Sequence, residues 1–294
     1  MKVSPIISYN YQPKHNASQK NSLSFSAHYD KYAKHIVNMH GDGVIYGSGS
    51  IKNYSHLFRN LKFYQIMPFL LDKKFPNGAV IYDYACSAGY EASSIVMAMK
   101  DKLPNEKVEK FMPVYAFDCN PQIVEEAKKY KLKLNGSELK SFHFFENIKK
   151  SDFLVPTKID RNGQVINFAT RNLTNNIIFD NGNIFEDLES GKLSKKPCVL
   201  FIKNTWQFLT DYGSRKLAKS LYDNLKSKSL VFIGDEDIDK FYGMTTDKVL
   251  LDTGFKAVED RFDITYKQKK NRTLYNRITL FEHKNLSDLC FEKP

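Results

Sequence analysis

The stretch from Val80 to Met99 constrains the fold of this chain more than any other part of the sequence. It begins with β-prone residues, passes through the small residues 85–89, and ends in an apolar run with the character of a helix. A strand, a tight turn and a helix form the first half of a βαβ unit, and ligands of open α/β sheets bind beyond the carboxyl end of such a strand. The stretch therefore predicts an α/β fold with a nucleotide-type ligand near this turn.

The turn differs from the dinucleotide fingerprint Gly-x-Gly-x-x-Gly, because two of the three glycines are missing. An acid and alternating small residues stand there instead, namely Asp83, Ala85, Ser87 and Gly89. Small side chains let the backbone approach a ligand closely, and Gly89 can adopt dihedral angles that are closed to other residues. The pattern alone does not identify the ligand.

Length and composition bound the classes of protein that this chain can form. Its 294 residues fit one large α/β domain or two small ones. No apolar run approaches the roughly 20 residues that cross a bilayer, and no apolar signal segment follows Lys2, so no membrane insertion is expected. The cysteines form no Cys-x-x-Cys pair, which favours free thiols in the cytoplasm; they are Cys86, Cys119, Cys198 and Cys290.

The formal net charge of +11 raises the question of a nucleic-acid partner. The Lys and Arg residues are spread over many segments, however, among them a predicted helical stretch at 128–133, a loop at 192–196 and a hairpin at 267–272. Solvated lysine-rich faces are the simpler interpretation, and an acidic partner, either protein or nucleic acid, is the alternative.

Changes in composition divide the chain into three segments. Residues 1–28 are rich in Asn, Ser, Gln and Lys and are predicted to be a disordered tail. Residues 29–75 are expected to be a helical N-terminal segment, with a short helix at Tyr29–Met39 and a second at about Tyr54–Asp72. Residues 76–294 are expected to form the ligand-binding α/β domain, which carries a small antiparallel β insertion at about 136–178.

Short apolar runs predict the strands of this α/β domain. Those of the main sheet are Val80–Tyr82, Val114–Asp118, Asn176–Phe179, Cys198–Ile202, Ser229–Ile233, a strand near Lys256–Asp260 and a last strand at Tyr275–Glu282. The two terminal strands are expected to pair antiparallel at the edge of the sheet. Those of the insertion are Phe142–Phe145, Asp152–Val155 and Val165–Phe168.

Asp118 closes the second predicted strand and is the first candidate for ligand contact outside the turn. A carboxylate at this position can accept two hydrogen bonds from a ribose diol. The alternative is that Asp118 caps the helix that begins at Pro121, since Asp is a common N-cap residue.

Four segments, in order along the chain, match motifs of one protein family. Residues 85–94 resemble Cys-Ser-x-Gly-Glu-Glu-x-x-Ser, residues 53–59 resemble Asn-x-Thr-x-Phe-Phe-Arg, residues 116–121 resemble a Ser-Asp-Ile-Asp stretch, and residues 201–208 resemble Cys-Arg-Asn-x-x-x-Tyr-Phe. Over about residues 50–240 the chain therefore resembles the CheR-type chemotaxis receptor methyltransferases, which belong to class I of the S-adenosylmethionine-dependent methyltransferases.

The resemblance implies both a fold and an activity. The fold is Rossmann-like: a seven-stranded, mostly parallel sheet with an antiparallel last strand, helices on both faces, a small antiparallel β insertion and short N-terminal helices. The activity is that of a protein carboxyl O-methyltransferase with S-adenosyl-L-methionine as cofactor and S-adenosyl-L-homocysteine as product. The acceptor would be a protein or a small polar molecule, including an acidic one, with nucleic acid as the weaker alternative.

The resemblance also implies roles for individual residues. Glu91 would hold the amino end of the cofactor and Asp118 the ribose, Asn183 and Ile184 would frame the adenine, and Asn204 would lie beside the sulfonium. Asn53, Ser55 and Arg59 would close over the methionine part, with Arg59 and Asn204 as the catalytic residues. The remaining cofactor contacts would be Cys86, Gly89, Cys119 and Thr205. Two of these residues have simpler interpretations, Glu91 as a first-turn acid favoured by the helix dipole and Asn183 as part of an Asn-Gly turn.

Two departures from the family motifs keep other functions open. Phe208 stands where the family has a tyrosine, and Lys203 replaces an arginine, which loses a planar two-point grip on a carboxylate. A catalytically silent protein of the same fold that binds S-adenosylmethionine or S-adenosylhomocysteine is therefore one alternative. An RNA or DNA methyltransferase is another, prompted by the positive charge. The seven histidines are scattered, and no cluster of metal ligands is expected.

Overall fold

The computed structural model describes residues 56–193, 195–206, 209, 211–234, 237, 245–258, 261–267, 273–279 and 289–294. The predicted tail, the predicted helix at Tyr29–Met39, and the site candidates Asn53, Ser55 and Phe208 lie outside these residues. Within the described part, no helix is long and apolar enough to cross a membrane.

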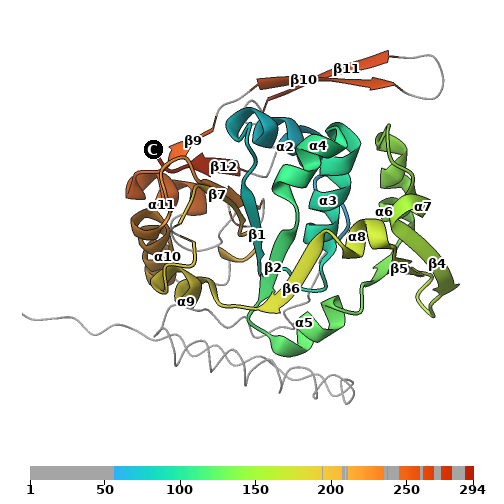
Figure 1. Ribbon diagram of the computed structural model, residues 1–294, viewed down its shortest axis with the longest axis horizontal. Coiled ribbons are helices and arrows are strands. Elements are labelled where there is room, and N and C mark those ends of the chain that lie inside the picture. Colours follow the sequence, from blue (N-terminus) through green and yellow to red (C-terminus); the bar gives the residue numbers. More distant parts are fainter. Residues whose placement is uncertain are drawn as a thin grey trace, which may run out of the picture.

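A seven-stranded sheet organises the molecule (Figure 1), and its strands lie in the order β6-β2-β1-β7-β8-β12-β9. The bounds are β1 Val80–Tyr84, β2 Val114–Asp118, β6 Ile177–Asn181, β7 Cys198–Phe201, β8 Leu230–Ile233, β9 Lys256–Ala257 and β12 Leu289–Glu292. Neighbours from β6 to β8 pair in parallel, and β12 pairs antiparallel with both β8 and β9. The expected mostly parallel, seven-stranded sheet is confirmed.

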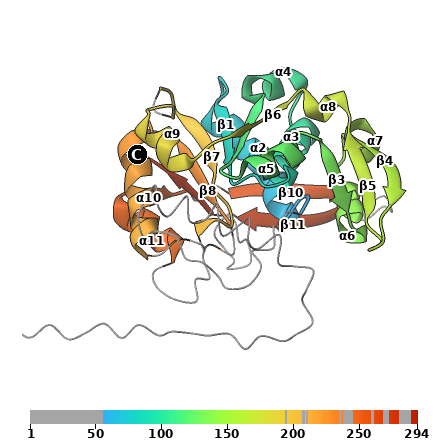
Figure 2. The ribbon, with the colours of Figure 1, turned by 90° about the horizontal axis from the view of Figure 1, so that it is seen from below.

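Helices cover both faces of this sheet, because its central strands are apolar on both sides. Along β7, for example, Phe201 packs into one core cluster and Leu200 into the other. Figures 1 and 2 show α2 and α3 on one side and α9, α10 and α11 on the other. The bounds are α2 Leu61–Lys74, α3 Tyr90–Lys102, α4 Asn105–Val108, α5 Pro121–Ala127, α6 Gly136–Ser141, α7 Lys150–Phe153, α8 Arg171–Thr174, α9 Ile184–Glu189, α10 Asp211–Asn224 and α11 Thr246–Thr253, with 3-10 helices η1 Glu109–Phe111 and η2 Phe142–Phe144.

The insertion is a separate antiparallel sheet of three strands, in the order β3-β5-β4. The bounds are β3 Lys131–Leu134, β4 Leu154–Ile159 and β5 Val165–Ala169. The predicted helix through 128–133 is wrong, because Lys and Leu alternate over β3 and place every second side chain inside. The predicted strand at Phe142–Phe145 is also wrong: Phe142 and Phe145 are both buried, a spacing that suits the 3-10 turn found there.

The carboxyl-terminal strands differ from the prediction as well. The two predicted terminal strands do not pair with each other: β9, within the predicted Lys256–Asp260, pairs with β12. Strand β11 (Thr273–Thr279), which overlaps the predicted Tyr275–Glu282, pairs antiparallel with β10 (Arg261–Lys267) in a two-stranded sheet of its own. The antiparallel strand of the main sheet is β12, whose Cys290 and Phe291 are buried. The tip of the hairpin, with the lysines of 268–272, lies outside the described residues.

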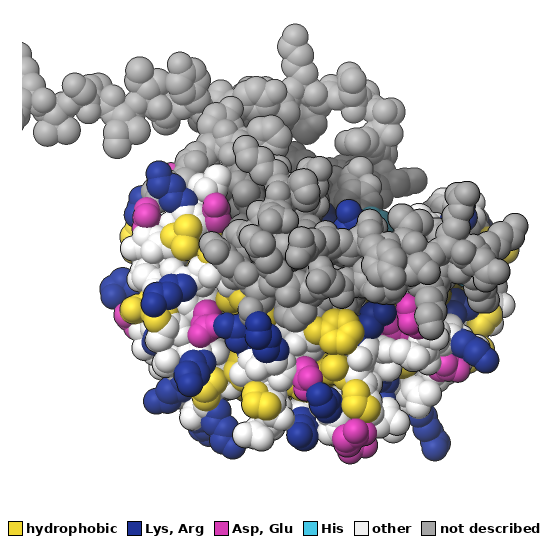
Figure 3. Space-filling view, turned by 90° about the horizontal axis from the view of Figure 1, so that it is seen from above, with side chains coloured by type: hydrophobic (Ala, Val, Ile, Leu, Met, Phe, Trp, Pro, Cys, Tyr) yellow, Lys and Arg dark blue, Asp and Glu magenta, His cyan; other side chains and the backbone are white. Residues whose placement is uncertain are grey.

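Charged side chains of both signs lie on the described part of the face seen in Figure 3. On the face seen in Figure 3, Lys and Arg alternate with Asp and Glu and do not gather in one patch. Several lysines are paired with nearby acids, as in the Lys219–Asp223 and Lys107–Asp72 ion pairs.

Candidate active site

The turn after β1 has an unusual backbone, which its small residues make possible. Ala85, Ser87 and Gly89 all have positive φ angles, of 61°, 51° and 82°. A Cβ atom on Gly89 would lie 2.4 Å from Cζ of the Phe179 ring, which presses against the turn from β6. The residue therefore has to be a glycine, both for its φ angle and for the space available.

Asp118, at the end of β2, holds this turn in place. Its Oδ2 accepts a hydrogen bond from the backbone N–H of Ser87 at 3.0 Å, and its Oδ1 accepts one from the N–H of Asn120 at 2.9 Å. Burial raises the pKa of Asp118, and the two N–H groups oppose that rise. The side chain of Asn120 caps α5, so Asp118 is not the N-cap. Its two oxygens keep acceptor capacity for a ligand.

Glu91, in the first turn of α3, forms an ion pair with the buried Lys203. Its Oε1 lies 2.9 Å from Nζ of Lys203 and accepts a hydrogen bond from the hydroxyl of Tyr64 at 2.9 Å. The side chain of Lys203 is 1% exposed, and its Nζ lies 4.5 Å from the centroid of the Phe63 ring. The ammonium group is thus held by one carboxylate and by aromatic faces.

Asp83, near the end of β1, adds a further buried acid to this cluster. Burial raises its pKa well above the ordinary range, the charge of Glu91 adds to the rise, and Lys203 opposes it. Among the described residues, Oδ2 of Asp83 is buried and has no hydrogen-bond partner. Of the three acids Asp83, Glu91 and Asp118 at this end of the sheet, Asp83 is thus the one with a buried oxygen that has no partner among the described residues.

The turn after β7 brings Asn204 to the same end of the sheet, since β7 pairs directly with β1. Asn204 has a φ of 55°, and its N–H donates to Oδ2 of Asp237 at 2.5 Å. The N–H groups of Trp206 and Gly234 donate to the same carboxylate at 2.8 and 2.9 Å. The hydroxyl of Thr205 donates to the backbone oxygen of Lys203 at 3.1 Å.

The other predicted contacts are more dispersed. The side chain of Asn183 accepts a hydrogen bond from the N–H of Phe185 and caps α9, and Ile184 packs against the core below it. Cys86 is buried and Cys119 is exposed. Arg59 is half-buried in the turn that leads into α2.

Sequence reasoning missed Tyr64, Asp83 and Lys203 as parts of the site. Lys203 occupies the arginine position of a matched motif and could have been included on that ground; Asp83 opens the small-residue pattern of the β1 turn. Tyr64 carried no sequence signal, because its hydroxyl reaches Glu91 from a helix 27 residues earlier in the chain. Among the described residues, no group of His, Cys, Asp and Glu could hold a metal ion.

The fold and the acidic cluster at the carboxyl ends of its central strands are those expected of a class I S-adenosylmethionine-dependent methyltransferase. The chain matches the family model of the CheR methyltransferase SAM-binding domain over residues 53–247, more than half of its length, and so belongs to the CheR methyltransferase family. The predicted family, enzyme class and cofactor are confirmed.

The solved structures that match this chain are distant from it in sequence and in structure. They include a TehB-like SAM-dependent methyltransferase from Corynebacterium glutamicum, 13% identical over 92% of this chain and 100% of the other, with a TM-score of 0.40. Another is the O-methyltransferase TomG from Streptomyces achromogenes in complex with SAM, 9% identical over 79% of this chain and 80% of the other, with a TM-score of 0.38. No curated protein matches the chain.

Proposed function

We propose that the chain binds S-adenosylmethionine across the carboxyl ends of β1, β2, β6 and β7 and transfers its methyl group to a carboxylate or another small polar group of a protein or small molecule. The observation that carries this proposal is the set of carboxyl groups at the β1 turn, whose hydrogen-bonding capacity the described residues leave partly unused. Asp118 has unused acceptor capacity, and Oδ2 of Asp83 has no partner among the described residues.

The residues present suit this cofactor. Its amino group and its ribose hydroxyls are hydrogen-bond donors, and carboxylates accept from such groups. We assign the amino group to Glu91, the ribose to Asp118 and the adenine to Asn183 and Ile184. Cys86, Gly89, Cys119 and Thr205 complete the proposed contacts, and Asn53 and Ser55, which lie outside the described residues, are assigned to the methionine part.

The cofactor supplies an electrophilic methyl group, and the chain supplies orientation. Methyl transfer requires the accepting atom to be held about 3–3.5 Å from the methyl carbon and in line with the bond that breaks. We assign this positioning to Arg59 and Asn204. A carboxylate acceptor is already ionised at neutral pH, since the pKa of Glu is about 4.3, so it requires no general base, whereas an amine or hydroxyl acceptor would.

Binding of S-adenosylhomocysteine to the purified protein, measured by calorimetry, tests the proposal. We expect a dissociation constant in the low micromolar range, about −8 kcal/mol. E91Q should weaken binding about 30-fold, because it removes the charged acceptor for the amino group. E106Q is the matched control, since Glu106 is an exposed first-turn acid of α4 and should leave binding unchanged. Folded protein that binds no S-adenosylhomocysteine would contradict the proposal.

The double variant E91Q/K203M separates two causes of an E91Q effect. E91Q alone leaves the buried Lys203 ammonium without its carboxylate, which destabilises the fold. Replacing Lys203 by Met at the same time removes that unpaired charge and should recover stability. The affinity of the double variant for S-adenosylhomocysteine should stay low, because the carboxylate that accepts from the cofactor is still missing. An affinity restored to that of the wild type would show that Glu91 acts only by stabilising Lys203.

A silent binding protein is the second candidate, and Lys203, which stands where the family has an arginine, favours it. Its ammonium lies 2.9 Å from Oε1 of Glu91 and lacks the planar two-point grip of a guanidinium on a carboxylate. Such a protein would bind S-adenosylhomocysteine but transfer no labelled methyl group from S-adenosylmethionine to any protein or small molecule of a cell extract. Labelled product would exclude it.

We also propose that the protein works in the cytoplasm. The thiols of Cys86, Cys119 and Cys198 are not joined in disulfides, as expected in a reducing compartment.

A further inference from the structure

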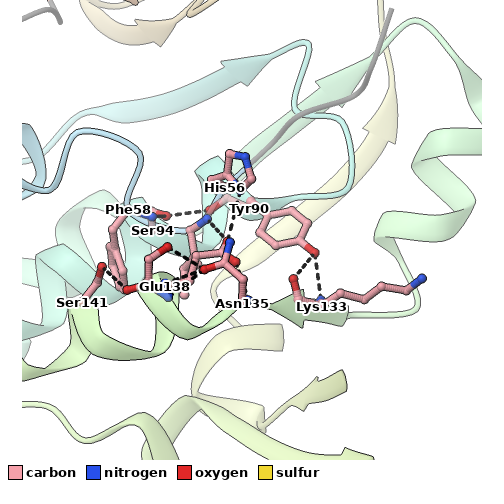
Figure 4. A network of polar contacts seen from close by, with 10 residues as sticks. His56, Phe58, Tyr90, Ser94, Lys133, Asn135, Glu138 and Ser141 are labelled. Atoms are coloured by element: carbon pink, nitrogen blue, oxygen red, sulfur yellow. Dashed lines mark hydrogen bonds and ion pairs between the residues drawn. The ribbon is translucent and has the colours of Figure 1, made fainter. Parts of the chain in front are cut away.

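A polar network ties the residues just before α2 to the β insertion (Figure 4). Its centre is Glu138, a buried residue in the first turn of α6. Oε1 accepts a hydrogen bond from the N–H of Leu57 at 2.8 Å, and Oε2 accepts one from the N–H of Asn135 at 2.8 Å. Nδ1 of His56 lies 3.7 Å from Oε1. One carboxylate thus joins segments 81 residues apart in the chain.

Phe58 is held from two further directions. Its N–H donates to Oγ of Ser94 in α3 at 2.8 Å. Its ring packs against two aromatic rings of the insertion, with centroid distances of 4.4 Å to Phe145 and 5.3 Å to Phe142. The backbone around Leu57 and Phe58 is therefore fixed by both α3 and the insertion.

These contacts hold a strained turn. Phe58 and Asn60 have φ angles of 54° and 56°, a region that a bulky residue such as Phe rarely adopts. Such a conformation persists only where the surrounding structure over-determines it. Arg59 lies between these two residues, so the position of its backbone depends on the same contacts.

We propose that Glu138 is a positioning residue for methyl transfer: it holds the turn 56–60 and thereby places Arg59 at the cofactor. The insertion then contributes to cofactor binding through a carboxylate that does not touch the cofactor. This inference rests on the role given to Arg59 in the proposed function. Loss of the Glu138–Leu57 hydrogen bond would release the turn toward unstrained conformations in which Arg59 is displaced.

Binding of S-adenosylhomocysteine by the E138A variant tests the inference. We expect affinity to fall about tenfold, the effect of losing a hydrogen bond to a charged group. N135A is the matched control. It also weakens the start of α6, because the Asn135 side chain accepts from the N–H groups of Ser137 and Glu138, yet it leaves the bond to Leu57 in place. N135A should change affinity less than twofold.

A double-mutant comparison with R59A distinguishes positioning from general weakening of the fold. If Glu138 acts through Arg59, then R59A/E138A should bind as R59A does, since the second change has nothing left to displace. If E138A still lowered affinity tenfold in the R59A background, the inference would be overturned. It would also be overturned if R59A bound more weakly than the wild type while E138A kept wild-type affinity. An R59A variant with wild-type affinity would instead overturn the role of Arg59 in the proposed function.

The variant S94A serves where E138A does not fold. It removes the acceptor for the Phe58 N–H and leaves the insertion unchanged. We expect affinity to fall about threefold to fivefold. This is about half the E138A effect on a logarithmic scale, because S94A removes a neutral acceptor whereas E138A removes a charged one. This loss should again disappear in the R59A background, and its persistence there would contradict the inference.

Discussion

The turns after β1 and β7 are built on the same plan but have different capacities to bind a ligand. Each follows a central strand, contains at least one residue of positive φ, and is held by an aspartate at or beyond the carboxyl end of the neighbouring strand. For the β1 turn this residue is Asp118, the last residue of β2; for the β7 turn it is Asp237, which comes after β8.

The two aspartates differ in how many hydrogen bonds the protein itself provides. Asp237 is fully buried and accepts three backbone N–H groups, from Asn204, Trp206 and Gly234. Asp118 accepts two and is 8% exposed. An aspartate in the same setting can thus either stabilise the fold or bind a ligand. Which of the two it does depends on how much of its hydrogen-bond acceptor capacity the protein leaves unused.

The largest predicted effect is the loss of stability in D237A. Three buried N–H groups would lose their acceptor, which should lower the free energy of unfolding by about 4 kcal/mol. D118A should lower it by only about 1 kcal/mol, because burial already disfavours the charged carboxylate there. D118A should instead weaken S-adenosylhomocysteine binding about 30-fold.

Urea denaturation and calorimetry of both variants measure this contrast. D223A is the control, since Asp223 pairs with Lys219 on the surface and should change the free energy of unfolding by less than about 0.5 kcal/mol. If D118A destabilised the protein as much as D237A, both aspartates would be structural and the distinction between the two turns would fail.

The next effect concerns the packing of the β1 turn. G89A adds a methyl group at a positive φ and 2.4 Å from the Phe179 ring, and should lower the free energy of unfolding by about 3 kcal/mol. G163A is matched in backbone only: its φ is 75°, but nothing lies within 4 Å of the added Cβ. It should cost about 1 kcal/mol. Thermal or urea unfolding measures both variants. If G89A and G163A lowered the free energy of unfolding equally, the Phe179 ring would have moved aside, and the turn would be less tightly packed than the structure indicates.

The smallest effect is a pH dependence that runs in opposite directions for stability and binding. Burial raises the pKa of Asp118 above its unfolded value of about 3.9, so folding favours its protonated form. The stabilisation that the raised pKa of Asp118 provides is therefore fully present below a pH of about 3.9. It is lost as the pH rises through the pKa of Asp118 in the folded protein. Affinity for S-adenosylhomocysteine should rise over the same window, by less than about tenfold, because the ionised carboxylate accepts hydrogen bonds better.

Calorimetry from about pH 4, near the unfolded pKa, up to pH 7.5 measures this dependence, with D118N as the variant that cannot titrate at this position. The wild type should bind more tightly at pH 7.5 and D118N should show a flatter profile. A wild-type affinity that is the same at both pH values would remove the evidence that Asp118 contacts the ligand.

Local sequence patterns identified most of the main sheet and the matched motifs of the family. The bounds of β2 agree with the apolar run that predicts them, and β1, β6, β7 and β8 lie within one or two residues of their predicted positions. Such runs are informative because a strand buried on both faces has to be apolar throughout. The errors fall where the signal is short or ambiguous, as with the Lys-Leu alternation of β3 and the late strand β12.

The sequence by itself determined the family, the cofactor class and the small-residue turn, because these depend on residue types at fixed spacing in one stretch of chain. Only the tertiary structure decided which polar groups meet: Glu91 with Lys203 and Tyr64, and Glu138 with Leu57. It also decided that Asp237 accepts three backbone N–H groups whereas Asp118 accepts two. The physical reason is that hydrogen-bond capacity is a property of the whole environment of a side chain, and no local pattern records it.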